Sequence, residues 1–90
     1  MSSKRSSMLS RIEQERERQV DVAGSELDAH NTPNDWIAIA SYYLVQETKR
    51  ATMLTPPNSE EFERELVKAA AVILAALEHV DVMKEHGNLS

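Results

Sequence analysis

The stretch FERELVKAAAVILAALEHVDVM, residues 62–83, decides the fold because its apolar residues recur at helical spacing. One set alternates four and three residues apart, which is the pattern of a helix-packing seam. That seam comprises Phe62, Leu66, Ala69, Ile73, Ala76, Val80 and Met83. A second apolar stripe lies beside it and comprises Val67, Ala70, Leu74 and Leu77. Two apolar stripes on one helix require two neighbouring elements.

The limits of this helix follow from residues at its two ends. Asn58 is a good N-cap, and Glu61 occupies the reciprocal position of a capping box. Gly87 suits a helix C-terminus, so the helix is predicted to run without interruption to about His86. Before it, the sequence LTPPNS at residues 54–59 marks a break, because prolines cannot continue a helix.

Two further helices are predicted upstream. Thr32 as N-cap and Pro33 at the first helical position begin one that runs to about residue 52. Its first half is apolar nearly all round, so we expect it to be buried on more than one side. A thin amphipathic helix covers residues 8–22, Gly24 ends it as a left-handed cap, and residues 24–31 form a loop.

These elements predict an all-α chain of three helices with a long C-terminal helix. Residues 1–7 are Ser-rich and basic and are predicted to be a disordered arm, followed by a single helical domain at 8–87 and a tail at 88–90. A chain of 90 residues without cysteine builds only a small core. We therefore expect a homo-oligomer to complete the helical bundle, and a charge at Ile73 to disrupt both assembly and folding.

Composition excludes several classes of function. The 15 acidic residues outnumber the 10 basic ones, which argues against a DNA-binding protein. The longest apolar run, residues 69–77, is far short of the roughly 20 residues of a membrane span. The N-terminus lacks the apolar segment of a secretory signal. We expect a soluble, cytoplasmic protein that binds neither DNA nor membrane.

The acidic residues offer two candidate roles each. Glu78 and Asp81 form an ExxD pair, which could bind Mg²⁺ or could simply be solvated near a helix end. Asp35 falls in the first turn of a helix, where it could stabilise the N-terminus or contribute a ligand. His30 has no second histidine at ligand spacing, so a zinc site is not expected.

Three other side chains are candidates for binding a ligand. Arg16 lies among glutamates and could form surface ion pairs or bind a phosphate with its planar guanidinium. Trp36 could stack on a base or belong to the core. Lys68 lies at the edge of an apolar helix, from which its ammonium could reach a pocket or a carboxylate.

The order of several motifs resembles small phage and prophage proteins. The first motif, ERxRQxxxxG, is formed here by Glu15, Arg16, Arg18, Gln19 and Gly24. NDW at residues 34–36 then opens an Ala- and Tyr-rich helix, and LVKAAAVILAALEHVD at residues 66–81 closes the pattern. The likeness spans about residues 12–81.

The layout is also similar to the all-α nucleotide pyrophosphohydrolases of the MazG-like type. That resemblance implies that an ExxE pair and a later ExxD pair hold Mg²⁺ against a triphosphate. Glu78 and Asp81 match the ExxD pair, and Asp35 is the candidate for the earlier one, with Ala38 at its second position. The implied metal ligands are therefore Asp35, Glu78 and Asp81. Mg²⁺ is expected as a cofactor only if the nucleotide interpretation holds.

Together the resemblances imply a phage-type accessory protein that acts in the host cytoplasm, in counter-defence. It would bind a host protein or a nucleotide-like molecule. The alternatives are a Mg²⁺-dependent nucleoside triphosphate pyrophosphohydrolase and a purely structural interaction module. A nucleotide site requires Arg16, Asp35, Lys68, Glu78 and Asp81 to converge, whereas an interaction module requires an exposed apolar patch.

Overall fold

The computed structural model describes residues 3–22, 25–51 and 58–90. Within these ranges the chain is all-α, as predicted, and has no strand. The elements are α1 (Ser3–Val20), the 3₁₀ helix η1 (Ser25–His30), α2 (Pro33–Ala51), α3 (Ser59–Glu78) and α4 (Val80–Glu85). Gly24 and residues 52–57, where a cap and a break were predicted, lie outside the described residues. None of the described helices is long and apolar enough to cross a membrane.

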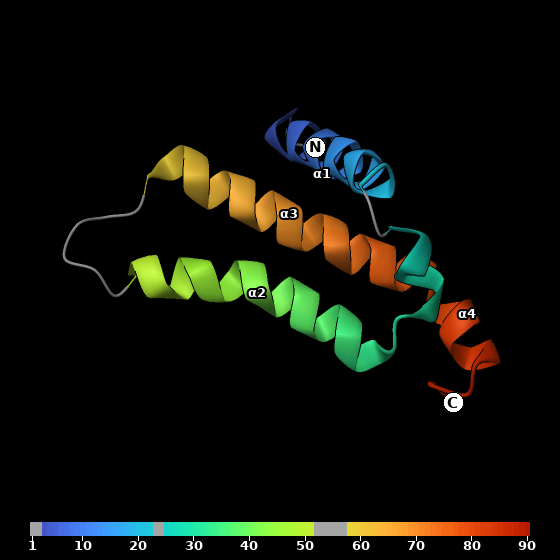
Figure 1. Ribbon diagram of the computed structural model, residues 1–90. Coiled ribbons are helices and arrows are strands. Elements are labelled where there is room, and N and C mark those ends of the chain that lie inside the picture. The colour runs from blue at the N-terminus through green and yellow to red at the C-terminus, as the bar shows by residue number, and fades with distance from the viewer. Residues whose placement is uncertain (1–2, 23–24, 52–57) are drawn as a thin grey trace.

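Helix α3 is the centre of the molecule. It packs along α2 on one side and against α1 on another (Figure 1). Helices α2 and α3 run antiparallel, which places Trp36, near the start of α2, beside His79 at the end of α3. η1 contacts α4 at the end of the molecule where the C-terminus lies.

The predicted caps of α2 and α3 are confirmed. Thr32 and Asp35 form a capping box: the Asp35 backbone N–H donates to Thr32 Oγ1 at 3.2 Å, and the Thr32 N–H donates to Asp35 Oδ2 at 2.9 Å. Asn58 Oδ1 accepts from the backbone N–H groups of Glu60 and Glu61 at 2.9 and 3.2 Å. Each cap satisfies amide donors that the first helical turn leaves unpaired.

The prediction of one uninterrupted C-terminal helix was wrong. The helix breaks at His79, whose backbone N–H donates to the carbonyl of Ala76, three residues back, at 3.1 Å. The His79 ring donates from Nδ1 to the Ala75 carbonyl at 2.7 Å, which holds the ring beside Trp36. After the break α4 turns so that Met83 is buried in the core.

Gly87 ends α4 as predicted. Its φ of +76° is the left-handed conformation that glycine adopts without strain. The Gly87 N–H donates to the Lys84 carbonyl, and the Asn88 N–H donates to the Met83 carbonyl at 2.8 Å, which together form a Schellman motif. This turn brings Leu89, from the predicted tail, against the core.

The core is small and lies between α2, α3 and α4. Its buried members are Trp36, Ala40, Val72, Ala75 and Met83. Of the seam predicted in α3, Ala69 and Met83 are buried, whereas Phe62, Leu66 and Ile73 stay exposed. The seam was therefore wrong for packing within one chain, because α3 turns its alanine-rich side towards its neighbours.

Helix α2 also differs from expectation. It buries Trp36 and Ala40 on one side, while Ile37, Tyr42 and Val45 remain exposed, so within one chain it is not buried on more than one side. Two upstream predictions are corrected as well. Helix α1 begins at Ser3, so residues 3–7 are helical rather than a disordered arm, and residues 25–30 form η1 rather than an irregular loop.

Candidate functional site

A groove of about 270 Å³ opens where α1, η1, α2 and α3 meet. Its polar lining consists of Arg16, Arg18, Gln19 and Asp28. Its apolar lining includes Ile39, Tyr43, Val72 and Ala75, together with the ring of Trp36. The volume approaches the range in which small ligands bind, and the groove combines an apolar wall with a few polar groups, as ligand pockets do.

Arg16 is a largely buried polar residue of this groove. Its side chain is only 13% exposed, and Nε donates to Glu78 Oε1 at 2.7 Å. Nη1 of the same guanidinium is buried without a hydrogen-bond partner among the described residues. A buried donor of this kind costs about 1–3 kcal/mol relative to a paired one, so an acceptor that reaches it would be stabilised.

Trp36 presents a second unpaired donor. The side chain is 5% exposed and packs against the His79 ring at a centroid distance of 5.4 Å. Its indole Nε1 is buried without a partner among the described residues. Trp36 is therefore a core residue rather than a stacking platform, and its N–H, like Arg16 Nη1, belongs to a side chain that lines the groove.

Arg18 is fixed by Glu15 on the same helix. Its Nε and Nη2 donate to the two carboxylate oxygens at 2.9 and 2.7 Å, and Gln19 Nε2 donates to Glu15 Oε2 at 3.1 Å. The hydrogen bonds from Arg18 lower the pKa of Glu15 below its usual 4.5 despite the opposing effect of burial. Glu15 in turn raises the pKa of Arg18.

A second groove of about 270 Å³ shares Arg18 with the first and is also lined by Glu15. Arg11 and Arg64 also line it, and Arg11 Nη1 lies 3.2 Å from Glu63 Oε1. Four arginines thus line the two adjoining grooves, together with Glu15 and Asp28. Three of these arginines are paired with a carboxylate: Arg16 with Glu78, Arg18 with Glu15 and Arg11 with Glu63.

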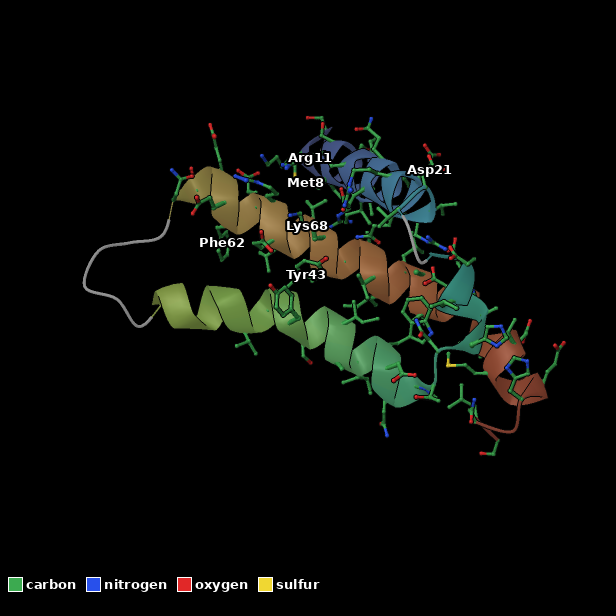
Figure 2. The ribbon with its side chains drawn as sticks, viewed as in Figure 1. Met8, Arg11, Asp21, Tyr43, Phe62 and Lys68 are labelled. Carbon is green, nitrogen blue, oxygen red and sulfur yellow. The ribbon has the colours of Figure 1, made fainter. Side chains whose placement is uncertain are left out.

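Two of the predicted ligand-binding residues, Arg16 and Trp36, share the first groove, whereas Lys68 and Asp35 do not line it. Lys68 Nζ lies 3.6 Å from Glu65 Oε1 and 5.9 Å from the centre of the Tyr43 ring. Figure 2 shows Tyr43 of α2 pointing towards α3 near Lys68. Asp35 is exposed, and its carboxylate is used in the capping box.

The predicted Mg²⁺ ligands do not form a metal site. The residues that the structure describes contain no group of three His, Cys, Asp or Glu side chains that could hold a metal ion. Glu78 ends α3 and Asp81 lies in α4, so the break at His79 interrupts the helix that was expected to place both on one face. Glu78 is paired with Arg16, and Asp35 caps α2. The chain's own residues therefore do not fit the magnesium centre that the resemblance implied.

Several groove residues were not singled out by sequence reasoning. Arg18 and Gln19 belong to the ERxRQ motif, so the sequence pointed to this segment. A helix of alternating charges is, however, typical of a solvent-exposed surface. Asp28 reaches the groove because η1 replaces the expected loop. His30 also lies in η1, where its ring stacks on His86 at 6.1 Å rather than joining a metal site.

The fold and groove define a small all-α protein with an arginine-lined groove. Comparisons with protein-family models, curated protein sequences and solved structures found no match to this chain.

Proposed function

We propose that this protein binds a nucleotide-like small molecule in the groove between α1, η1, α2 and α3. The observation that carries the proposal is the pair of buried, unpartnered donors, Arg16 Nη1 and Trp36 Nε1, in side chains that line this groove. Acceptor atoms of a bound ligand would pair with these donors and remove the cost of leaving them unsatisfied.

The chemistry of the groove suits a base better than a purely anionic ligand. Arg16 and Trp36 offer donors, Asp28 offers an acceptor, and Gln19 can do either. Ile39, Val72 and the Tyr43 ring supply an apolar wall for a flat heterocycle. A heterocycle that carries both carbonyl and amino groups uses this mixture fully, whereas a simple anion would be opposed by Asp28.

Phosphates would lie towards the second groove. Arg18 belongs to both grooves, and Arg11 and Arg64 line the second one. Arginine binds phosphate oxygens through its planar fork of donors. A nucleotide whose base occupies the first groove would therefore direct its phosphates along the side of α1 where these arginines gather.

Binding rather than hydrolysis is the activity that the residues support. Pyrophosphohydrolysis of the MazG-like kind requires carboxylates that gather around Mg²⁺, and Asp35, Glu78 and Asp81 do not meet. In a phage-type accessory protein, a tightly bound nucleotide would be withdrawn from the host, which is a route to counter-defence in the host cytoplasm. The phage origin and this role rest on the motif resemblance.

The test is calorimetric titration and thermal shift with a panel of nucleosides and their mono-, di-, tri- and cyclic phosphates. A ligand at 100 times its Kd stabilises the folded state by about 2.7 kcal/mol, which a melting curve detects readily. Arg16→Met should weaken binding at least about tenfold, since it removes the donor and keeps the aliphatic stem.

Two further variants serve as comparisons. Trp36→Phe keeps an aromatic ring in the core but removes the indole donor, so it should weaken binding at some cost in packing. Arg5→Met removes an exposed charge in the first turns of α1 and should leave affinity unchanged. Absence of binding across the panel, or equal affinity in Arg16→Met and the parent protein, would overturn the proposal.

The hydrolase alternative has its own measurement. Pyrophosphate release from nucleoside triphosphates with Mg²⁺ or Mn²⁺ should not exceed the background without protein. Robust release that Glu78→Gln and Asp81→Asn abolish would establish the enzyme instead.

A further inference from the structure

Helix α3 leaves one long apolar side uncovered. Phe62, Leu66, Ile73 and Leu77 are all exposed, with Ile73 at 48% and Leu77 at 65%. At 3.6 residues per turn these four positions fall within about 60° of one another around the helix. Val72 and Ala75, which pack in the core with α2, lie elsewhere around it. We call the four exposed residues the α3 stripe.

The α3 stripe contains no charge over its whole length. The intervening positions on the same side of the helix are Ala69 and Ala70, and Ser59 precedes Phe62 on that side. The chain as a whole is 28% charged and carries a net charge of −5. The acidic side chain beside the stripe, Glu63, is paired with Arg11 at 3.2 Å and so does not favour a strongly basic partner. A second acidic chain could approach there without placing like charges opposite one another.

The spacing of the stripe is symmetric about its midpoint. Leu66 and Ile73 are equally distant from the point between Ala69 and Ala70, and so are Phe62 and Leu77. An antiparallel copy of the helix would therefore set Leu66 opposite Ile73 and Phe62 opposite Leu77, with the smallest side chains at the crossing. Isologous contacts around a twofold axis require this kind of self-complementary pattern.

We propose that the α3 stripe binds the α3 stripe of a second copy of this chain, antiparallel and around a twofold axis near Ala70. Ala69 is already buried within the chain, so the close approach falls on the half-buried Ala70. The large residues on either side interdigitate, as ridges of one helix fill grooves of another.

An adjoining apolar groove adds to this surface. Met8 and Ile12 of α1 line a groove of about 260 Å³ together with Leu66, Val67 and Ala70 of α3, and Glu63 lies at the same groove. Met8 lies on α1 beside the first half of α3 in Figure 2. In the symmetric pairing, Ile73 of the second copy lies opposite Leu66 and so packs at the edge of this groove. The surface shares no residue with the first groove, proposed for the base, and shares only Val67 with the second groove, proposed for the phosphates. Variants at Arg16 and at Ile73 therefore test the two proposals separately.

The first test is sedimentation velocity on the full chain over a range of concentrations. The parent protein should sediment as a dimer. Ile73→Glu should weaken dimerisation at least about 30-fold, as loss of a central interface residue does. Its helix content should not change, in contrast to the loss of folding expected from the sequence, because Ile73 is exposed and the introduced carboxylate stays in water in the isolated chain. The matched control is Val45→Glu, at an exposed valine on the side of α2 opposite Trp36, which should remain dimeric.

A monomeric parent protein overturns the proposal, whether or not it then binds lipid vesicles or another protein. It is overturned equally if Val45→Glu rather than Ile73→Glu separates the copies. An Ile73→Glu variant that loses its helix content would mean that Ile73 is needed inside the chain, which also contradicts the proposal.

The second test reads the direction of pairing. The chain has no cysteine, so single cysteines can be introduced without background. Leu66→Cys and Ile73→Cys proteins, mixed and oxidised with copper phenanthroline, should cross-link to each other far more than either does to itself. Equivalent cross-linking of Leu66→Cys alone would indicate a parallel arrangement and overturn the antiparallel one.

Discussion

The two sides of α3 differ in the size of the residues they present. The side turned to its neighbours carries Ala71, Val72 and Ala75, all buried, whereas the open side carries Leu66, Ile73 and Leu77. Small residues allow helix backbones to approach, so contact within the chain is close but buries little apolar area per residue. The comparison teaches that the largest apolar residues of a helix do not always mark its intramolecular face.

The largest loss of stability is expected from a substitution in the buried core, which lies against the alanine-rich side of α3. Trp36→Ala should reduce the free energy of unfolding by about 3–5 kcal/mol, because it removes a large aromatic side chain from the buried core cluster. Tyr42→Ala, at an exposed ring on the same helix, should change it by less than about 0.5 kcal/mol. Urea unfolding followed by circular dichroism compares the two. Equal effects would show that α2 does not pack as described.

The next largest loss of stability is expected when a buried alanine of α3 is replaced by a larger apolar residue. Ala75→Leu is expected to cost about 1–3 kcal/mol by overpacking the close contact between α3 and its neighbours. Ala38→Leu on the exposed side of α2 is the matched control and should be nearly neutral. A neutral or stabilising Ala75→Leu in the same urea titration would mean that the buried side of α3 has room to spare.

Asp35 sharpens the distinction between structural and ligand-binding carboxylates. Since its carboxylate closes the capping box of α2, Asp35→Ser should cost at most about 1 kcal/mol. Nucleotide affinity should be unchanged, because Asp35 does not line the groove. Calorimetry on the folded variant decides the matter. Loss of binding with the fold intact would return Asp35 to the list of ligands.

The smallest expected effect is a change in the stability of the folded state at acidic pH. The hydrogen bonds from Arg18 lower the pKa of Glu15 in the folded state. At a pH between this lowered pKa and the pKa of Glu15 in the unfolded chain, the unfolded chain therefore binds more protons than the folded one. This contribution to stability is present above the usual value of 4.5 and is lost as the pH falls through the lowered one. Thermal unfolding should therefore show a weaker dependence on pH below 4.5 in Glu15→Gln than in the parent protein. Identical profiles would show that the Glu15–Arg18 pair adds nothing.

The sequence predicted what depends on local chemistry. The capping box at Thr32 and Asp35, the Asn58 cap and the Gly87 end follow from side chains that bond their own backbone within three residues. Apolar periodicity also identified α3 as the central helix. Periodicity could not predict which of these apolar residues pack within the chain, because it identifies the apolar positions of a helix but not the element that packs against each of them.

The groove was predicted only in part, for a similar reason. Arg16 and Trp36 were identified from their residue types, but their meeting depends on α1 lying against α3, which no local signal encodes. The break at His79 coincides with a contact between its ring and Trp36, which is distant in the sequence, so the ExxD pair looked continuous in the sequence. Asp28 was missed as a groove residue because its position depends on η1.

The most direct test of the nucleotide groove uses the single tryptophan of the chain. A ¹H–¹⁵N spectrum should contain one indole resonance, from Trp36 Nε1–H, the buried donor that has no partner among the described residues. On titration with the best ligand of the panel, this resonance should move in a saturable way, while the backbone amide of Ile73 on the open side of α3 stays in place. An indole resonance that does not move at saturating ligand would contradict the account.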